Sequence, residues 1–77
     1  MSEFKYEIKK SVGVFGETQN GWQKELNIVS WNERSPKIDI RDWDDKHNKM
    51  GKGITLGKDE FLKLKELFDD VDVSALG

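Results

Sequence analysis

The sequence predicts an α+β fold in which four antiparallel β-strands precede one C-terminal α-helix. Two observations lead to this class. Up to residue 56, apolar and polar residues alternate in short runs separated by turn signals, a period typical of strands with one buried face. After residue 57 the apolar residues recur at spacings of three and four, the period of an amphipathic helix. The 77 residues are predicted to form one small domain, spanning residues 1–77.

Two strands are predicted in the first half of the chain, over about residues 4–15 and 22–32. The polar segment between them ends in Asn20-Gly21, and an Asn-Gly pair between alternating runs is a strong hairpin signal. The apolar residues of the first strand share one parity, which predicts one common face for Phe4, Tyr6, Ile8, Val12 and Val14. In the second strand, Leu26 and Ile28 are expected on one face and Val29 and Trp31 on the other.

The third strand is predicted over Lys37–Trp43 and the fourth over residues 52–56, with a polar loop at 44–51 between them. In the third strand two isoleucines take one face, and the other face carries Lys37, Arg41 and Trp43. Pro36 cannot donate to a sheet hydrogen bond, so it marks the entry of this strand or a sheet edge. Because the connections between successive strands are short, we expect a four-stranded antiparallel meander.

The helix is predicted over about residues 58–70, with Gly57 as its N-cap. Glu60 stands three residues later, as in a capping box, although glycine contributes no side-chain oxygen. The apolar stripe of this helix is expected to pack in the core or against a second copy of the chain, and its main members are Phe61, Leu64, Leu67 and Phe68.

The strand parities predict one apolar sheet face, which we expect the helix to cover in part. It collects Phe4, Tyr6, Ile8, Val12, Val14, Leu26, Ile28, Ile38, Ile40, Ile54 and Leu56. The opposite face is predicted to remain bare and to carry Lys5, Lys9, Phe15, Val29, Trp31, Lys37, Arg41, Trp43 and Thr55. Three of these residues are large aromatics. On a monomer, such a patch indicates a partner surface, a dimer contact or a ligand site.

The composition limits the class of protein further. There is no cysteine, so no disulfide or thiolate metal site supplements the core. No apolar run approaches the roughly 20 residues that span a bilayer, and the N-terminal residues lack the pattern of a signal peptide. We therefore expect a soluble intracellular protein without a membrane partner, in which a second copy of the chain could bury more surface.

The charge is unevenly distributed, although the net charge is only -2. Residues 1–57 carry ten Lys/Arg and nine Asp/Glu, whereas residues 58–77 carry three and six. Charges more than about 10 Å apart are largely screened at 0.1 M salt. An acidic helix therefore does not exclude an anionic ligand on the sheet.

The best candidate site residues lie on the bare face of the third strand and its neighbours. Lys37 and Arg41 are about 13 Å apart along a strand, so both could hold phosphates of one extended nucleic-acid strand. Cross-strand ion pairs with Glu7 or Glu25 are the alternative. Trp31 and Trp43 are candidate platforms on which bases stack. For each tryptophan, packing under a loop or at a dimer contact is the alternative.

Other cations are weaker candidates for phosphate contacts. Lys49 and Lys52 flank Met50-Gly51, where a glycine would let the backbone approach a phosphate. Lys9 is at most auxiliary. His47 has no cysteine partner, so a structural zinc site is not expected, and no metal or cofactor is predicted. No nucleophile–base pair is suggested either, so we expect no catalytic residue and no enzyme.

Several motifs, in their order and spacing, resemble the positive cofactor four family of transcriptional coactivators. These are Ile38-Asp39-Ile40-Arg41, a polar loop, Gly51-Lys52-Gly53-Ile54-Thr55-Leu56, and the helix over residues 59–67. Residues 21–27, 30–32 and 47–53 are similar to the bacterial YdbC branch of this family. The resemblance covers nearly the whole chain.

The resemblance implies a curved four-stranded sheet and a helix, assembled as a homodimer that binds single-stranded DNA with little sequence preference. Arg41 and Lys52 match the basic residues of the family's motifs. The loop at 44–51 is less basic than is usual in the family, and the Ser- and Lys-rich tail of the eukaryotic coactivator is absent. Its regulatory role is therefore not implied here.

Two functional hypotheses follow. In the first, a cytoplasmic, nucleoid-associated homodimer binds single-stranded DNA, or RNA, through phosphate contacts and base stacking. In the second, the aromatic face recruits a protein partner, such as a component of the transcription or replication machinery. The cellular process that either function serves is left open by the sequence.

Overall fold

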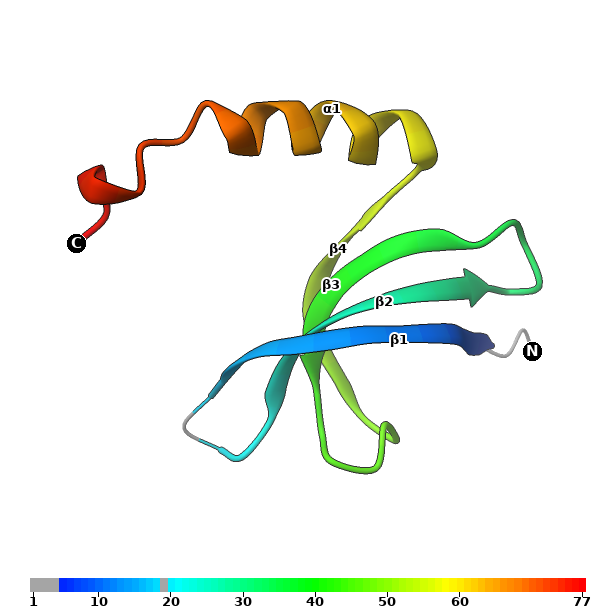
Figure 1. Ribbon diagram of the computed structural model, residues 1–77. Coiled ribbons are helices and arrows are strands. Elements are labelled where there is room, and N and C mark those ends of the chain that lie inside the picture. The colour runs from blue at the N-terminus through cyan, green and yellow to red at the C-terminus, as the bar shows by residue number, and fades with distance from the viewer. Residues whose placement is uncertain (1–4, 19) are drawn as a thin grey trace.

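The computed structural model describes residues 5–18 and 20–77 (Figure 1). Its elements are β1 (Tyr6–Glu17), β2 (Gln23–Trp31), β3 (Lys37–Trp43), β4 (Met50–Leu56), α1 (Lys58–Asp69) and the 3-10 helix η1 (Val73–Ala75). The predicted α+β class, four strands followed by a helix, is confirmed. The short η1 segment was not predicted, and Phe4 lies outside the described residues.

The four strands form one antiparallel sheet in the order β1-β2-β3-β4, which confirms the predicted meander (Figure 1). The pairing of β2 with β3 is unbroken from Gln23 opposite Trp43 to Val29 opposite Lys37. In contrast, the register of β1 against β2 shifts three times. Such β-bulges bend a strand and increase its twist. The sheet is accordingly strongly twisted (Figure 1).

Directly opposed residues share a sheet face, so the register defines two faces. The aromatic face carries Glu25, Asn27, Val29 and Trp31 of β2, and Lys37, Asp39, Arg41 and Trp43 of β3. The aliphatic face carries Leu26, Ile28, Ile38, Ile40, Ile54 and Leu56. Tyr6 lies opposite Trp31 and Ile8 opposite Val29, so both belong to the aromatic face. The prediction that they share the face of Leu26 was wrong, because the bulges in β1 reverse its parity along the strand.

Most of the buried side chains lie on the aromatic face, where Val29 and Trp43 are completely buried. The aliphatic face is only partly covered, and Ile54 is half exposed. This is the reverse of the predicted arrangement. The reason is that β1 and the β3–β4 loop close over the aromatic face. The ring centres of Tyr6 and His47 lie 5.3 and 5.4 Å from that of Trp43.

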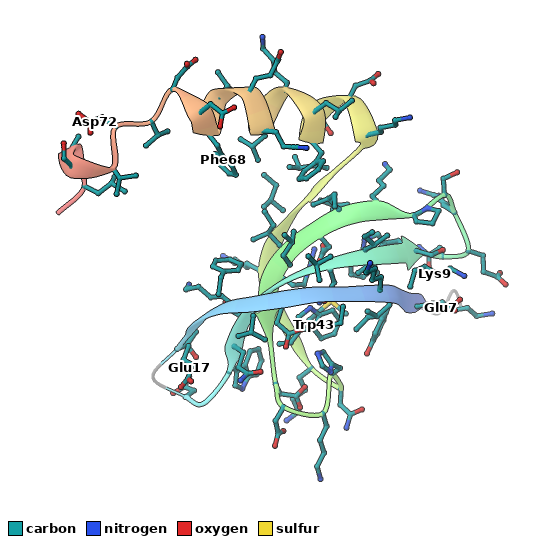
Figure 2. All side chains as sticks on the ribbon, viewed as in Figure 1. Glu7, Lys9, Glu17, Trp43, Phe68 and Asp72 are labelled. Atoms are coloured by element: carbon teal, nitrogen blue, oxygen red, sulfur yellow. The ribbon has the colours of Figure 1, made fainter. Side chains whose placement is uncertain are left out.

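The helix α1 extends from the end of β4 along one side of the sheet (Figure 1). Within the described residues it contacts only β3 and β4, and none of its residues is buried. Phe61 and Leu64 are partly covered, whereas Leu67 and Phe68 are exposed. The predicted core role of this stripe is therefore not fulfilled within one chain. Phe68 projects from the underside of the helix, on the side of the sheet (Figure 2).

Both ends of the helical region have defined caps. The backbone N–H of Gly57 donates to Glu60 Oε1 at 3.0 Å, which is the half of a capping box that glycine permits. Before η1, the carboxylate of Asp72 accepts hydrogen bonds from the hydroxyl and backbone N–H of Ser74, and these bonds lower the pKa of Asp72. No helix of the described residues is both long and apolar enough to cross a membrane.

Candidate nucleic-acid interface

A groove of about 300 Å³ opens on the aromatic face beside the β2–β3 turn, and its lining combines one indole ring with three cationic side chains. It is lined by Trp31, Arg34, Ser35, Lys37, Arg41 and Thr55. The structure thus brings together three predicted site residues, Trp31, Lys37 and Arg41. Their common face was predicted correctly because β3 alternates without a bulge against β2.

Trp31 ends β2 and forms the aromatic wall of this groove. The guanidinium carbon of Arg41 lies 4.8 Å from the centre of the indole ring, in the geometry of a cation–π contact. The ring of Tyr6 lies 6.0 Å away and is tilted by 47°. Trp31 is only partly buried, so it is both held in place and accessible.

Arg41 is bound to a carboxylate beneath the groove. Its Nε donates to Oδ2 of Asp39 at 2.7 Å, and Asp39 is completely buried. Thr55 donates to the other oxygen of this carboxylate at 2.9 Å. Further bonds run from the guanidinium to Thr55 Oγ1 at 3.4 Å and to the carbonyl of Gly51 at 3.3 Å. The side chain of Arg41 is therefore only 14% exposed.

The expected alternative for Arg41 was a cross-strand ion pair with Glu7 or Glu25. The ion pair exists, but its partner is Asp39, two residues earlier on the same strand. Gly53 lies opposite Arg41, and a Cβ at this position would collide with Cβ of Arg41 and the carbonyl of Ile40. Glycine at position 53 therefore permits the close pairing of β3 and β4 beneath the groove.

Arg34 is a groove residue that sequence reasoning missed. It closes a tight turn after Trp31, with its backbone N–H donating to the Trp31 carbonyl at 2.9 Å. The two residues between them, Asn32 and Glu33, have φ angles of 51° and 65°. These values are typical of a type I′ turn, which usually contains Asn and Gly. The sequence signal was weak because Glu33 occupies a position where glycine is expected.

Trp43 has a different environment from Trp31. It is completely buried against the sheet, in contact with the rings of Tyr6 and His47 (Figure 2). Nε2 of His47 lies 2.8 Å from the buried carboxylate of Glu25, and the Tyr6 hydroxyl donates to the His47 carbonyl at 2.5 Å. These contacts hold the β3–β4 loop over the indole. The predicted stacking role for Trp43 is therefore wrong for this chain, and the alternative of packing under a loop applies.

The remaining predicted cations do not line the Trp31 groove. Lys9 is exposed and pairs with Glu7 at 3.2 Å, at one end of β1 (Figure 2). Lys49 is exposed in the β3–β4 loop, where its backbone bonds to Asp44. Lys52 lines a separate groove of about 290 Å³ with Phe15, Lys24, Ile40, Arg41 and Asp42. Binding of nucleic acid by these three lysines stays a prediction.

Metal-ligating side chains do not cluster in the described part of the chain, where no group of three His, Asp or Glu residues converges. The oxygens of Asp39 are occupied by Arg41 and Thr55. Glu25 Oε1 also accepts a hydrogen bond from Asn27 at 3.0 Å. The buried carboxylates of this face therefore organise neighbouring side chains of the sheet.

The chain thus combines a twisted four-stranded sheet and a terminal helix with a sheet groove that is lined by an indole and cations. A family model described as Transcriptional Coactivator p15 (PC4) matches residues 18–67. The chain belongs to this family, whose members are non-enzymatic, bind single-stranded DNA and act in transcription. It is also 39% identical over 71 residues to a Treponema pallidum (strain Nichols) protein described as "Uncharacterized protein". That match covers 92% of this chain and 84% of the relative.

Proposed function

We propose that this protein binds single-stranded DNA without marked sequence preference, through the groove at Trp31. The observation that carries this proposal is the convergence of Trp31, Lys37 and Arg41 on one groove. Every base offers a π-face, so an indole platform stacks bases of any identity, and each stacked base contributes about 1–3 kcal/mol. Cations beside the ring can hold the phosphates on either side of that base.

We further propose that two copies of the chain associate. On the aliphatic face and the helix, several large apolar side chains are about half exposed or more, namely Ile54, Leu62, Leu67 and Phe68. In the described residues, only Val29 and Trp43 are apolar side chains that are fully buried. A domain of this size has little core to stabilise it, and a second copy offers an apolar surface of matching character. The groove at Trp31 lies on the other sheet face, so association leaves it open.

The test is a binding titration of the complete chain with a labelled oligo-dT, followed by fluorescence anisotropy over a salt series. A matched duplex and a matched single-stranded RNA are measured alongside. We expect binding to the single strand with quenching of tryptophan fluorescence, a steep loss of affinity with salt and weak binding to the duplex. Equal affinity for duplex and single strand at moderate salt would contradict the proposal. Tighter binding to the RNA would identify RNA as the ligand.

A further inference from the structure

We infer that Arg34 is a phosphate-binding residue of the groove, and that Arg41 acts as a positioning residue that holds Trp31. This inference rests on the proposed function and deepens it. The cations that line the groove fall into two groups. The charge of Arg41 is paired with a carboxylate of the protein, whereas those of Arg34 and Lys37 are not.

The charge of Arg41 is already compensated. Its Nε lies 2.7 Å from a carboxylate with no exposed surface, and its other nitrogens are bonded to Thr55 and to the Gly51 carbonyl. A phosphate would have to compete with this set of bonds. Because Asp39 cannot reach water, breaking the pair would leave an uncompensated buried charge. Arg41 therefore supplies a fixed surface beneath the indole ring at 4.8 Å.

The charges of Arg34 and Lys37 are available. Both side chains are exposed, and neither forms a side-chain hydrogen bond or ion pair with any residue in the ranges 5–18 and 20–77. Both line the groove with Trp31. An arginine also presents a planar fork of donors that matches two phosphate oxygens.

The backbone holds Arg34 at a defined place in the groove. Its carbonyl accepts a hydrogen bond from the nearly buried Ser30 hydroxyl at 2.6 Å, and its N–H is bonded to the Trp31 carbonyl. The turn itself is tied to the residue that precedes β1, since Asn32 and Lys5 exchange hydrogen bonds at 2.8 and 3.0 Å. Backbone strain at Glu33 persists only where the surroundings determine the conformation. These contacts fix the base of the Arg34 side chain next to the indole.

The salt dependence of oligo-dT binding separates the two roles. For a single strand, the slope of log affinity against log salt falls by about 0.7 for each phosphate contact that is lost. We expect Arg34→Gln to reduce the slope by about this amount and Arg34→Lys to restore most of it. The double variant Asp39→Asn/Arg41→Gln removes the buried pair without changing the net charge. We expect it to bind at least several-fold more weakly with an unchanged slope. Lys58→Gln, at the start of the helix, is the matched control and should match the wild type.

Each outcome decides the inference. A wild-type slope in Arg34→Gln overturns the assignment of Arg34, and this surface substitution is not expected to impair folding. A reduced slope in the double variant overturns the positioning role of Arg41, provided its circular dichroism spectrum is native. If the wild-type chain itself shows no salt-dependent binding to oligo-dT, the proposed function fails and this inference with it. If the wild type shows salt-dependent binding and Arg34→Gln has the same slope, the inference is overturned while the proposed function stands.

Discussion

The guanidinium carbon of Arg41 lies 4.8 Å from the centre of the Trp31 ring, and the same guanidinium is anchored to a carboxylate with no exposed surface. The indole ring is therefore fixed before any ligand arrives. Binding to a preorganised platform costs less conformational entropy than binding to a mobile side chain. The effects of substituting Trp31, and the residues that hold its ring in place, are therefore the most informative to measure.

Replacing Trp31 with alanine should weaken binding of oligo-dT by about 5- to 150-fold, because one base loses its stacking partner. The change should be seen by fluorescence anisotropy at fixed salt, and most of the tryptophan quenching should disappear with it. Trp31→Phe keeps an aromatic face and should bind at an intermediate level. An unaltered affinity in Trp31→Ala would show that the bases stack elsewhere.

Replacing Trp43 with phenylalanine should affect folding instead of binding. The side chain is completely buried against Tyr6 and His47, so a smaller ring leaves a cavity. We expect a loss of about 1–3 kcal/mol in the free energy of unfolding, measured by urea denaturation. The affinity of the folded variant for oligo-dT should equal that of the wild type. A binding defect with unchanged stability would restore the stacking role first predicted for this tryptophan.

Replacing Asp39 with alanine should strongly destabilise the chain. It removes the buried partner of Arg41 and the acceptor of the Thr55 hydroxyl. Removing one member of a buried ion pair typically costs about 3–5 kcal/mol, which thermal unfolding would detect as a large decrease in Tm. Glu7→Ala disrupts the exposed pair with Lys9 and serves as the control, with an expected change below about 1 kcal/mol. Equal effects of the two substitutions would contradict the importance of burial.

The regular part of the sheet could be predicted from the sequence because its register is unbroken. Lys37, Arg41 and Trp43 alternate in β3 and do share one face. In β1 the three register shifts reverse the parity, and nothing in a period-2 pattern reveals where a bulge occurs. Tyr6 was consequently placed on the wrong face.

The long-range parts of the site could not be predicted for a different reason. The burial of Trp43 depends on a loop that folds back, with a left-handed residue at His47 and a hydrogen bond to Tyr6. These residues are 41 positions apart in the sequence. Arg34 reaches the groove through a turn in which Glu33 occupies a position usually held by glycine. Both features depend on tertiary contacts, which override local pattern.

Replacing Glu33 with glycine should stabilise the chain by about 1 kcal/mol. The φ angle of this residue is 65°, a left-handed conformation that costs an L-residue about 1–2 kcal/mol and glycine almost nothing. Urea denaturation should show a higher midpoint with the same m-value. Glu33→Ala shortens the side chain but retains the strain, so its midpoint should not rise. If both variants gained equally, the benefit would come from the lost carboxylate and not from the backbone.

Replacing Phe68 with glutamate should dissociate the proposed dimer. This ring is 59% exposed in the single chain and lies on the helix beside other exposed apolar residues. A charge placed there costs little in an isolated chain but would be buried without a partner in an interface between two copies. Light scattering should give about twice the 8.9 kDa chain mass for the wild type and a single chain mass for Phe68→Glu. Lys58→Gln changes the charge by the same amount on the same helix and should remain dimeric. A wild-type mass equal to one chain would instead show that the aliphatic face and the helix stay uncovered in solution.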